Sequence, residues 1–149
     1  MKFSMFKAGR RFAYLVLLGG VALFDFISFD LVRRTFEFFT FEQGKAVVED
    51  RMLPRAPSPE QDMERYVGEA LLGPVSLDLA PLFTKGTRLR SLLYRDRVIY
   101  ADLSESAVLP IPGNRDVLQC LEVLERGIRR NFPQAAGVKL FIDGNEIIF

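Results

Sequence analysis

Apolar residues form one long run near the start of the chain, from Phe12 to Phe24, and after Asp25 the run resumes as far as Val32. Phe12 to Val32 has about the 20 residues that cross the hydrocarbon core of a bilayer. The part from Phe12 to Phe24 is apolar on every face of a helix, whereas a surface helix of a soluble protein is apolar on one face only. We therefore expect a membrane-spanning helix, in contact with the membrane, over residues 12–32.

The charges around this run predict its orientation. Basic residues are denser before the run than after it, where only Arg33 and Arg34 follow closely. Because positive flanks stay in the cytoplasm, we expect a single pass through the cytoplasmic membrane with the C-terminal domain outside. Residues 1–34 are then a signal-anchor segment, and residues 35–149 are a separate domain. The basic residues that precede the run are Lys2, Lys7, Arg10 and Arg11.

A cleaved signal peptide is the alternative. The uninterrupted part of the run is short enough for an h-region, and Gly20 and Ala22 are small enough to precede a cleavage site. Asp25 also weakens the anchor, since a carboxylate deep in lipid costs about 2.5–3.5 kcal/mol. Strongly apolar residues continue directly after Ala22, which argues against cleavage. We expect the uncleaved anchor, and secretion after cleavage stays open.

The pattern changes to extended structure after residue 35. Phe36 to Phe41 is aromatic and β-prone, which predicts a strand. A turn around Gly44 follows, and Ala46 to Met52 returns as the second strand of a hairpin. The aromatic stripe favours core or sheet packing over a surface that stacks a ligand.

A helix follows, with signals at both ends. Ser58 is a good N-cap, Pro59 suits the first helical position, and Gln61 completes a capping box. Gly73 and Pro74 stop the helix after about Leu72. Its apolar residues recur at helical spacing and predict one buried face. They are Met63, Tyr66, Val67, Ala70 and Leu71.

The remaining chain alternates loops, strands and one more helix. Residues 75–86 form a loop with apolar plugs, and the strands 87–94 and 98–103 form a hairpin. A second helix runs from an N-cap at Asn114 to Asn131, and two strands, 138–142 and 145–149, flank a hairpin turn at Asp143 and Gly144. We expect an α+β domain, with a mixed or antiparallel sheet of hairpins and two packed helices. The expected loop plugs are Leu77, Leu79, Leu82 and Phe83.

Composition removes several function classes. The chain has 20 basic and 19 acidic side chains, so it is no general polyanion binder and we expect no nucleic acid partner. It has no histidine, the commonest general base and metal ligand. Cys120 is the only cysteine, and its apolar neighbours predict a buried, inert thiol. With no phosphate-binding or nucleophile motif either, we expect no catalytic residue, no cofactor and no metal.

Two groups of residues are the remaining candidates for function. Asp102 and Asp143 could form a carboxylate pair of the kind used in glycoside hydrolysis. Both lie at a strand end or turn, where aspartate is favoured for local hydrogen bonding, so we expect a structural role. Four arginines gather at the 87–103 hairpin and are a candidate surface for an anionic glycan or lipid, although a solvated strand face also explains them. They are Arg88, Arg90, Arg95 and Arg97.

The order and spacing of these pieces resemble the GerMN domain, a sporulation and spore-germination family of bacterial envelope proteins. The likeness covers about residues 36–149. The sequence Arg95-Asp96-Arg97 departs from the glycine turn that the family tends to carry. The matching pieces are Ala70 to Pro74, Leu79 to Pro81, Lys85 to Thr87, Val98 to Ser104, Asn131 to Pro133 and Val138 to Gly144.

The resemblance implies an α/β module akin to ring-building domains, with an extracytoplasmic role in envelope assembly or peptidoglycan association. It supplies no catalytic residues. We therefore expect a membrane-anchored, non-catalytic module that binds or assembles with an envelope protein or peptidoglycan, and that can form oligomers. A cell-wall-active hydrolase that uses carboxylates is the alternative.

Overall fold

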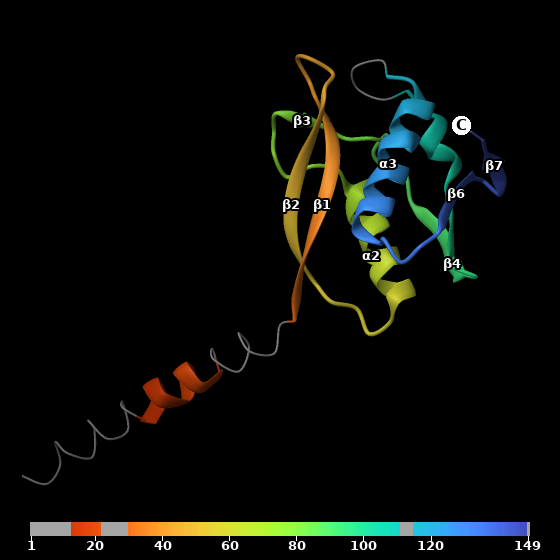
Figure 1. Ribbon diagram of the computed structural model, residues 1–149. Helices are drawn as coiled ribbons and strands as arrows, with labels where there is room; N and C mark the ends of the chain where they lie inside the picture. Colours follow the sequence, from red (N-terminus) through yellow and green to blue (C-terminus); the bar gives the residue numbers. More distant parts are fainter. Residues whose placement is uncertain (1–12, 22–29, 111–114, 149) are drawn as a thin grey trace, which may run out of the picture.

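The computed structural model describes residues 13–21, 30–110 and 115–148 (Figure 1). Residues 13–21 are helical, and every side chain among them is exposed. Within the described ranges, no helix combines the length and the apolar character needed to cross a membrane. Residues 12 and 22–29 of the segment predicted to span the membrane, and the predicted N-cap Asn114, lie outside the described residues.

The first hairpin is longer than its aromatic pattern predicts. Strand β1 runs from Leu31 to Thr40 and pairs in antiparallel register with β2, Ala46–Pro54. Val32 lies opposite Leu53, so the last two residues of the predicted spanning segment are part of a sheet. The sequence does not predict this extension, because Leu31 and Val32 suit a strand and an apolar helix equally well.

The strands form two sheets where one was predicted. The two-residue strand β3, Leu79–Ala80, pairs with the end of β1 and completes a sheet of order β2-β1-β3. The second sheet has the order β4-β5-β6-β7, and its central pair β5 and β6 is parallel. The prediction of a mixed sheet holds for this second sheet. Its strands are Leu89–Arg95, Val98–Leu103, Gly137–Ile142 and Asn145–Ile147.

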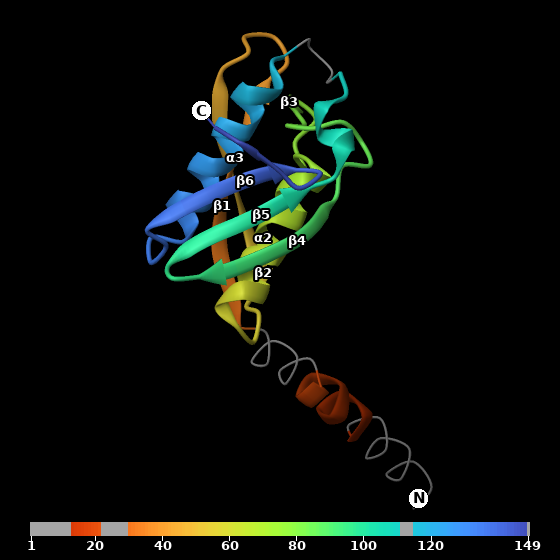
Figure 2. The ribbon, with the colours of Figure 1, turned by 90° about the vertical axis from the view of Figure 1, so that its right-hand side faces the viewer.

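Two helices lie between the sheets, so the domain has three layers (Figure 1). Helix α2, Pro59–Leu72, is confirmed at both ends, and Ser58 accepts the N-cap hydrogen bond from the Gln61 amide at 3.2 Å. Helix α3, Val117–Asn131, begins after Asp116, whose carboxylate accepts from the Leu118 amide, so the N-cap is Asp116 and the prediction of Asn114 is wrong. A 3-10 turn, η1, Glu105–Val108, follows β5. Figure 2 shows the second sheet face-on, with α3 behind it.

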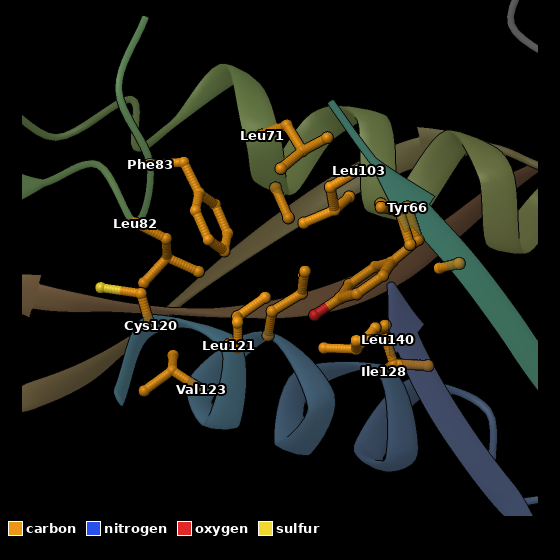
Figure 3. Packing of buried hydrophobic residues seen from close by; sticks show 14 of the residues in the cluster. Tyr66, Leu71, Leu82, Phe83, Leu103, Cys120, Leu121, Val123, Ile128 and Leu140 are labelled. Carbon is orange, nitrogen blue, oxygen red and sulfur yellow. The ribbon is translucent and has the colours of Figure 1, made fainter. Parts of the chain in front are cut away.

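The core forms where the inner faces of both sheets meet the two helices. Figure 3 shows Phe83 and Leu82 from the loop after β3 packing towards α3 beside Cys120. Three of the four predicted loop plugs are buried, but Leu77 is 93 % exposed. Burial raises the pKa of the Cys120 thiol to about 11, so the thiol is protonated and inert at neutral pH, as predicted.

On the side of β1 that faces away from β2, strand β3 pairs only with the end of β1, and the rest of that edge has no neighbouring strand. Asn131, the last residue of α3, bonds to this edge at Thr35. Its side-chain oxygen accepts from the Thr35 amide at 2.9 Å, and its nitrogen donates to the Thr35 carbonyl at 2.6 Å. The Tyr66 hydroxyl donates to the same carbonyl at 3.1 Å. Side chains of both helices therefore replace the strand that would otherwise pair with β1 here.

Candidate binding surfaces

The predicted arginine surface is divided between the two ends of β4. Arg95 and Arg97 flank the β4–β5 turn, where Asp96 and Arg97 take positive φ angles of 52° and 62° and so make a tight turn without glycine. Arg97 donates from Nε to the Gln134 carbonyl at 3.1 Å. This end of the second sheet is well exposed, but only these two of the four arginines reach it.

Arg88 and Arg90 lie at the opposite end of β4, next to the β6–β7 turn. The Arg90 guanidinium contacts Asp143 and lies 3.4 Å from the Asp102 carboxylate. Arg90 is thus neutralised by two carboxylates, and an anionic partner would have to compete with both. The structure does not gather the four arginines into one patch, and binding of a glycan or lipid by either pair stays a prediction.

Asp102 and Asp143, the candidate catalytic carboxylates, do lie close together. Both contact Arg90, and Asp102 also accepts from the Gly144 amide at 3.0 Å. Asp143 has φ 50° at the first turn position, where aspartate tolerates the left-handed region. These bonds tie the β6–β7 turn to the end of β5, which is a complete structural explanation for both residues. Within the described part of the chain, no group of His, Cys, Asp and Glu could hold a metal ion.

Arg51 and Arg34 are each half-buried against an aromatic ring, and neither was predicted as a binding residue. Arg51 lies over the Phe36 ring, 4.6 Å from its centroid, and donates to the Gly73 carbonyl at 2.7 Å. Arg34 lies over the Phe132 ring and pairs with Asp62. Phe36 itself is fully buried, which confirms that the aromatic stripe packs in the core. Both arginines join β1 and β2 to the helix layer, so we assign them to the fold.

An exposed apolar surface lies at the end of β1 farthest from residue 30. Phe41 follows β1 and is 53 % exposed, and Leu77 projects from the loop that leads into β3. Both line a shallow pocket of about 330 Å³, together with Thr40 and Asp78. We call Phe41 and Leu77 the apolar tip. The predictions that Phe41 belongs to a strand and that Leu77 is an apolar plug of its loop are wrong, because the exposure of single apolar residues leaves no periodic signal in the sequence.

These features define a small α+β domain whose described residues offer exposed apolar and charged surfaces around a closed core. The chain belongs to the Germane family, described as sporulation and spore germination, which matches residues 38–148. The predicted resemblance to GerMN domains is therefore confirmed. A search of curated proteins finds no match.

Two solved structures, both from the sporulation protein GerM of Bacillus subtilis, show the same fold. The first GerMN domain of the sporulation protein GerM from Bacillus subtilis has a TM-score of 0.59 at 20 % identity, over 78 % of this chain and 86 % of that one. The tandem GerMN domains of the same protein give 0.52 at 18 % identity, over 79 % of this chain and 41 % of that one. The chain thus spans less than half of the tandem structure. A lipoprotein structure from Clostridium perfringens has a TM-score of 0.43 at 20 % identity, over 77 % of this chain and 76 % of that one.

Proposed function

We propose that this protein is a membrane-tethered, non-catalytic module that holds its GerMN-type domain on the outer face of the cytoplasmic membrane and binds a cell-envelope protein. The observation that carries the proposal is that the chain has two exposed apolar surfaces, the helix before the domain and the apolar tip on the domain. Exposure of either surface to water is unfavourable, so we expect the membrane to cover the helix and an envelope protein to cover the tip. Peptidoglycan is the alternative partner.

The tether rests on residues 13–21. Tyr14, Leu15 and Leu17 are exposed on this helix, and no charged residue lies between Ala13 and Val21. A helix that is apolar on all faces is stable where a protein core or lipid covers it. The apolar sequence continues beyond it in both directions, from Phe12 to Phe24, so the lipid of the cytoplasmic membrane is the cover we propose.

The binding surface rests on the apolar tip. Phe41 and Leu77 are exposed together around a pocket, and aromatic and aliphatic side chains of this kind anchor protein interfaces. The tip has Glu42 and Asp78 at its rim, which fits the polar rim of such an interface. The domain core does not need these side chains, because Leu79, Leu82 and Phe83 already fill the space beneath the loop.

Cross-linking in cells tests the apolar tip. With a photoreactive benzoylphenylalanine in place of Leu77, we expect ultraviolet light to join the chain to an envelope protein, because position 77 lies in the proposed interface. The matched control places the same residue at Leu93, which is also exposed but lies on the second sheet. A Phe41→Ser change should reduce the adduct about tenfold, which corresponds to a loss of about 1.4 kcal/mol. Equal adducts from positions 77 and 93 would contradict the proposal.

The hydrolase alternative makes a different prediction. Incubated with purified peptidoglycan, the full chain is expected to release no soluble fragments, because Arg90 occupies both carboxylates. Chromatography of the supernatant measures fragments, and sedimentation of the chain with peptidoglycan measures binding. If the chain releases fragments and the Asp102→Asn and Asp143→Asn variants do not, the protein is a hydrolase and the proposed binding module is wrong.

A further inference from the structure

Strand β2 is the longest edge strand of either sheet within the described residues, and no side chain or further strand bonds to its outward backbone groups before Pro54. Asn131 and Tyr66 close β1, Glu60 accepts from the Tyr94 amide on the edge of β4, and β7 is only three residues long. β2 runs for nine residues and pairs on one side only. A long uncovered edge is a template for another strand.

The register shows which backbone groups this edge presents. Thr40 donates to the Lys45 carbonyl at 2.9 Å, and Arg55 donates to the Asp30 carbonyl at 2.8 Å, so bonded pairs use odd-numbered residues of β2. Hydrogen bonding alternates along an antiparallel pair. The N–H and C=O groups of Val48, Asp50 and Met52 therefore point away from β1. Pro54 also faces outward, and its carbonyl accepts from Arg65, so the free stretch ends there.

The side chains of β2 are complementary to a second copy of the same strand. In an antiparallel pair centred on Asp50, Val48 lies opposite Met52 of the second copy, and both are exposed, 47 % and 56 %. Val47 then lies opposite Leu53. Apolar cross-strand pairs of this kind stabilise a sheet. Glu49 and Arg51 pair with each other within each chain, so they bring no unpaired charge to the interface. The outward residues 48, 50 and 52 fall in the hydrogen-bonded positions of this register.

The two Asp50 carboxylates would face each other at the centre, and like charges opposite one another are unfavourable. Each one, however, has its own compensation. Arg33 pairs with Asp50, and the Thr35 hydroxyl donates to it at 2.7 Å. These two bonds hold the pKa of Asp50 below its usual value, so each carboxylate already has a cation beside it.

We propose that β2 pairs with β2 of a second copy of this chain, in antiparallel register centred on Asp50, and joins the two three-stranded sheets into one. The interface is isologous, because the same strand contributes both halves. Its two-fold axis runs perpendicular to the sheet, so the N-terminal ends of β1 lie at opposite ends of the joined strands. Two tethered copies can pair in this way with the joined sheet lying along the membrane surface.

Disulfide trapping tests the register in the full chain, purified in detergent, with Cys120→Ala removing the native thiol. At the centre of the pair, Cα atoms lie about 5.5 Å apart, within the range that a disulfide bridges. A mild oxidant that takes up the two electrons and two protons of the thiols should therefore convert most of an Asp50→Cys chain to a covalent dimer. Val47→Cys is the control, since its two copies lie about 20 Å apart in this register.

A second variant separates pairing from random collision. Val48→Pro removes an outward N–H and leaves the bonds between β1 and β2 intact, so it should abolish trapping at position 50 while circular dichroism stays unchanged. In sedimentation equilibrium, the unmodified chain should be dimeric and Val48→Pro monomeric. Equal trapping at positions 47 and 50, trapping that survives Val48→Pro, or a monomeric unmodified chain would each overturn the proposal.

Discussion

Replacing Leu17 and Leu18 by aspartate is expected to move the chain from the membrane fraction to the soluble fraction. Both residues lie in the exposed helix 13–21, where Leu17 is 66 % and Leu18 is 71 % exposed. A carboxylate near the centre of a spanning helix costs about 2.5–3.5 kcal/mol on insertion scales. Two of them cost about 5–7 kcal/mol, enough to reverse insertion.

Fractionation of cells with an alkaline wash measures this effect by immunoblot. The control exchanges the same two residues for valine, which keeps the helix apolar and should leave the chain with the membranes. An aspartate variant that stays membrane-bound, or an unmodified chain that is soluble, would contradict the tether. The mass of the mature chain decides between a cleaved signal peptide and an uncleaved anchor. A start at Leu23 indicates cleavage, and an intact N-terminus indicates an anchor.

Replacing Gly127 by alanine is expected to destabilise the domain. An added Cβ would lie 2.5 Å from the Tyr66 hydroxyl, which donates to the Thr35 carbonyl and cannot easily move. Figure 3 shows this hydroxyl pointing towards α3. Overpacking a core costs about 1–3 kcal/mol. Alanine gains up to about 1 kcal/mol over glycine in a helix, so we expect a net loss of about 1–2 kcal/mol.

Urea denaturation measures the loss, and two further variants locate its cause. Gly68→Ala is the matched control, because nothing lies within 4 Å of the added Cβ and only the gain in helix propensity remains. Tyr66→Phe removes the hydroxyl and its hydrogen bond, for a cost of about 1 kcal/mol. Combined with Gly127→Ala, it should cost less than the sum of the two single changes. Additive losses would show that the hydroxyl is not what Gly127 accommodates.

The elements that the sequence predicted well are those whose signals are local. Helix α2 begins and ends at the expected residues because Ser58 supplies the cap and Gly73, at φ 93°, ends it. The strand β5 and the turn at Asp143 and Gly144 were likewise predicted from residues that make contacts nearby in the sequence. Capping and turn signals depend on residues that are close in the sequence, so they predict structure without knowledge of the tertiary contacts.

The features that the sequence analysis missed depend on contacts between distant segments. The division into two sheets arises because both helices are placed between the hairpins, which periodicity does not encode. The separation of Arg90 from Arg95 follows from strand length, whereas the exposure of Leu77 follows from how its loop crosses to β3. The closure of β1 by Asn131 joins residues that are 96 positions apart. No local pattern in a single sequence specifies such pairs.

The central claim is that the domain stands outside the cytoplasmic membrane, and labelling of one cysteine tests it most directly. Leu77→Cys, in a chain with Cys120→Ala, places a thiol at a residue that is almost fully exposed. A maleimide that cannot cross membranes is added to intact spheroplasts and to lysed ones. We predict equal labelling in both, because the apolar tip is extracytoplasmic. Labelling that requires lysis would place the domain inside the cell and contradict the account.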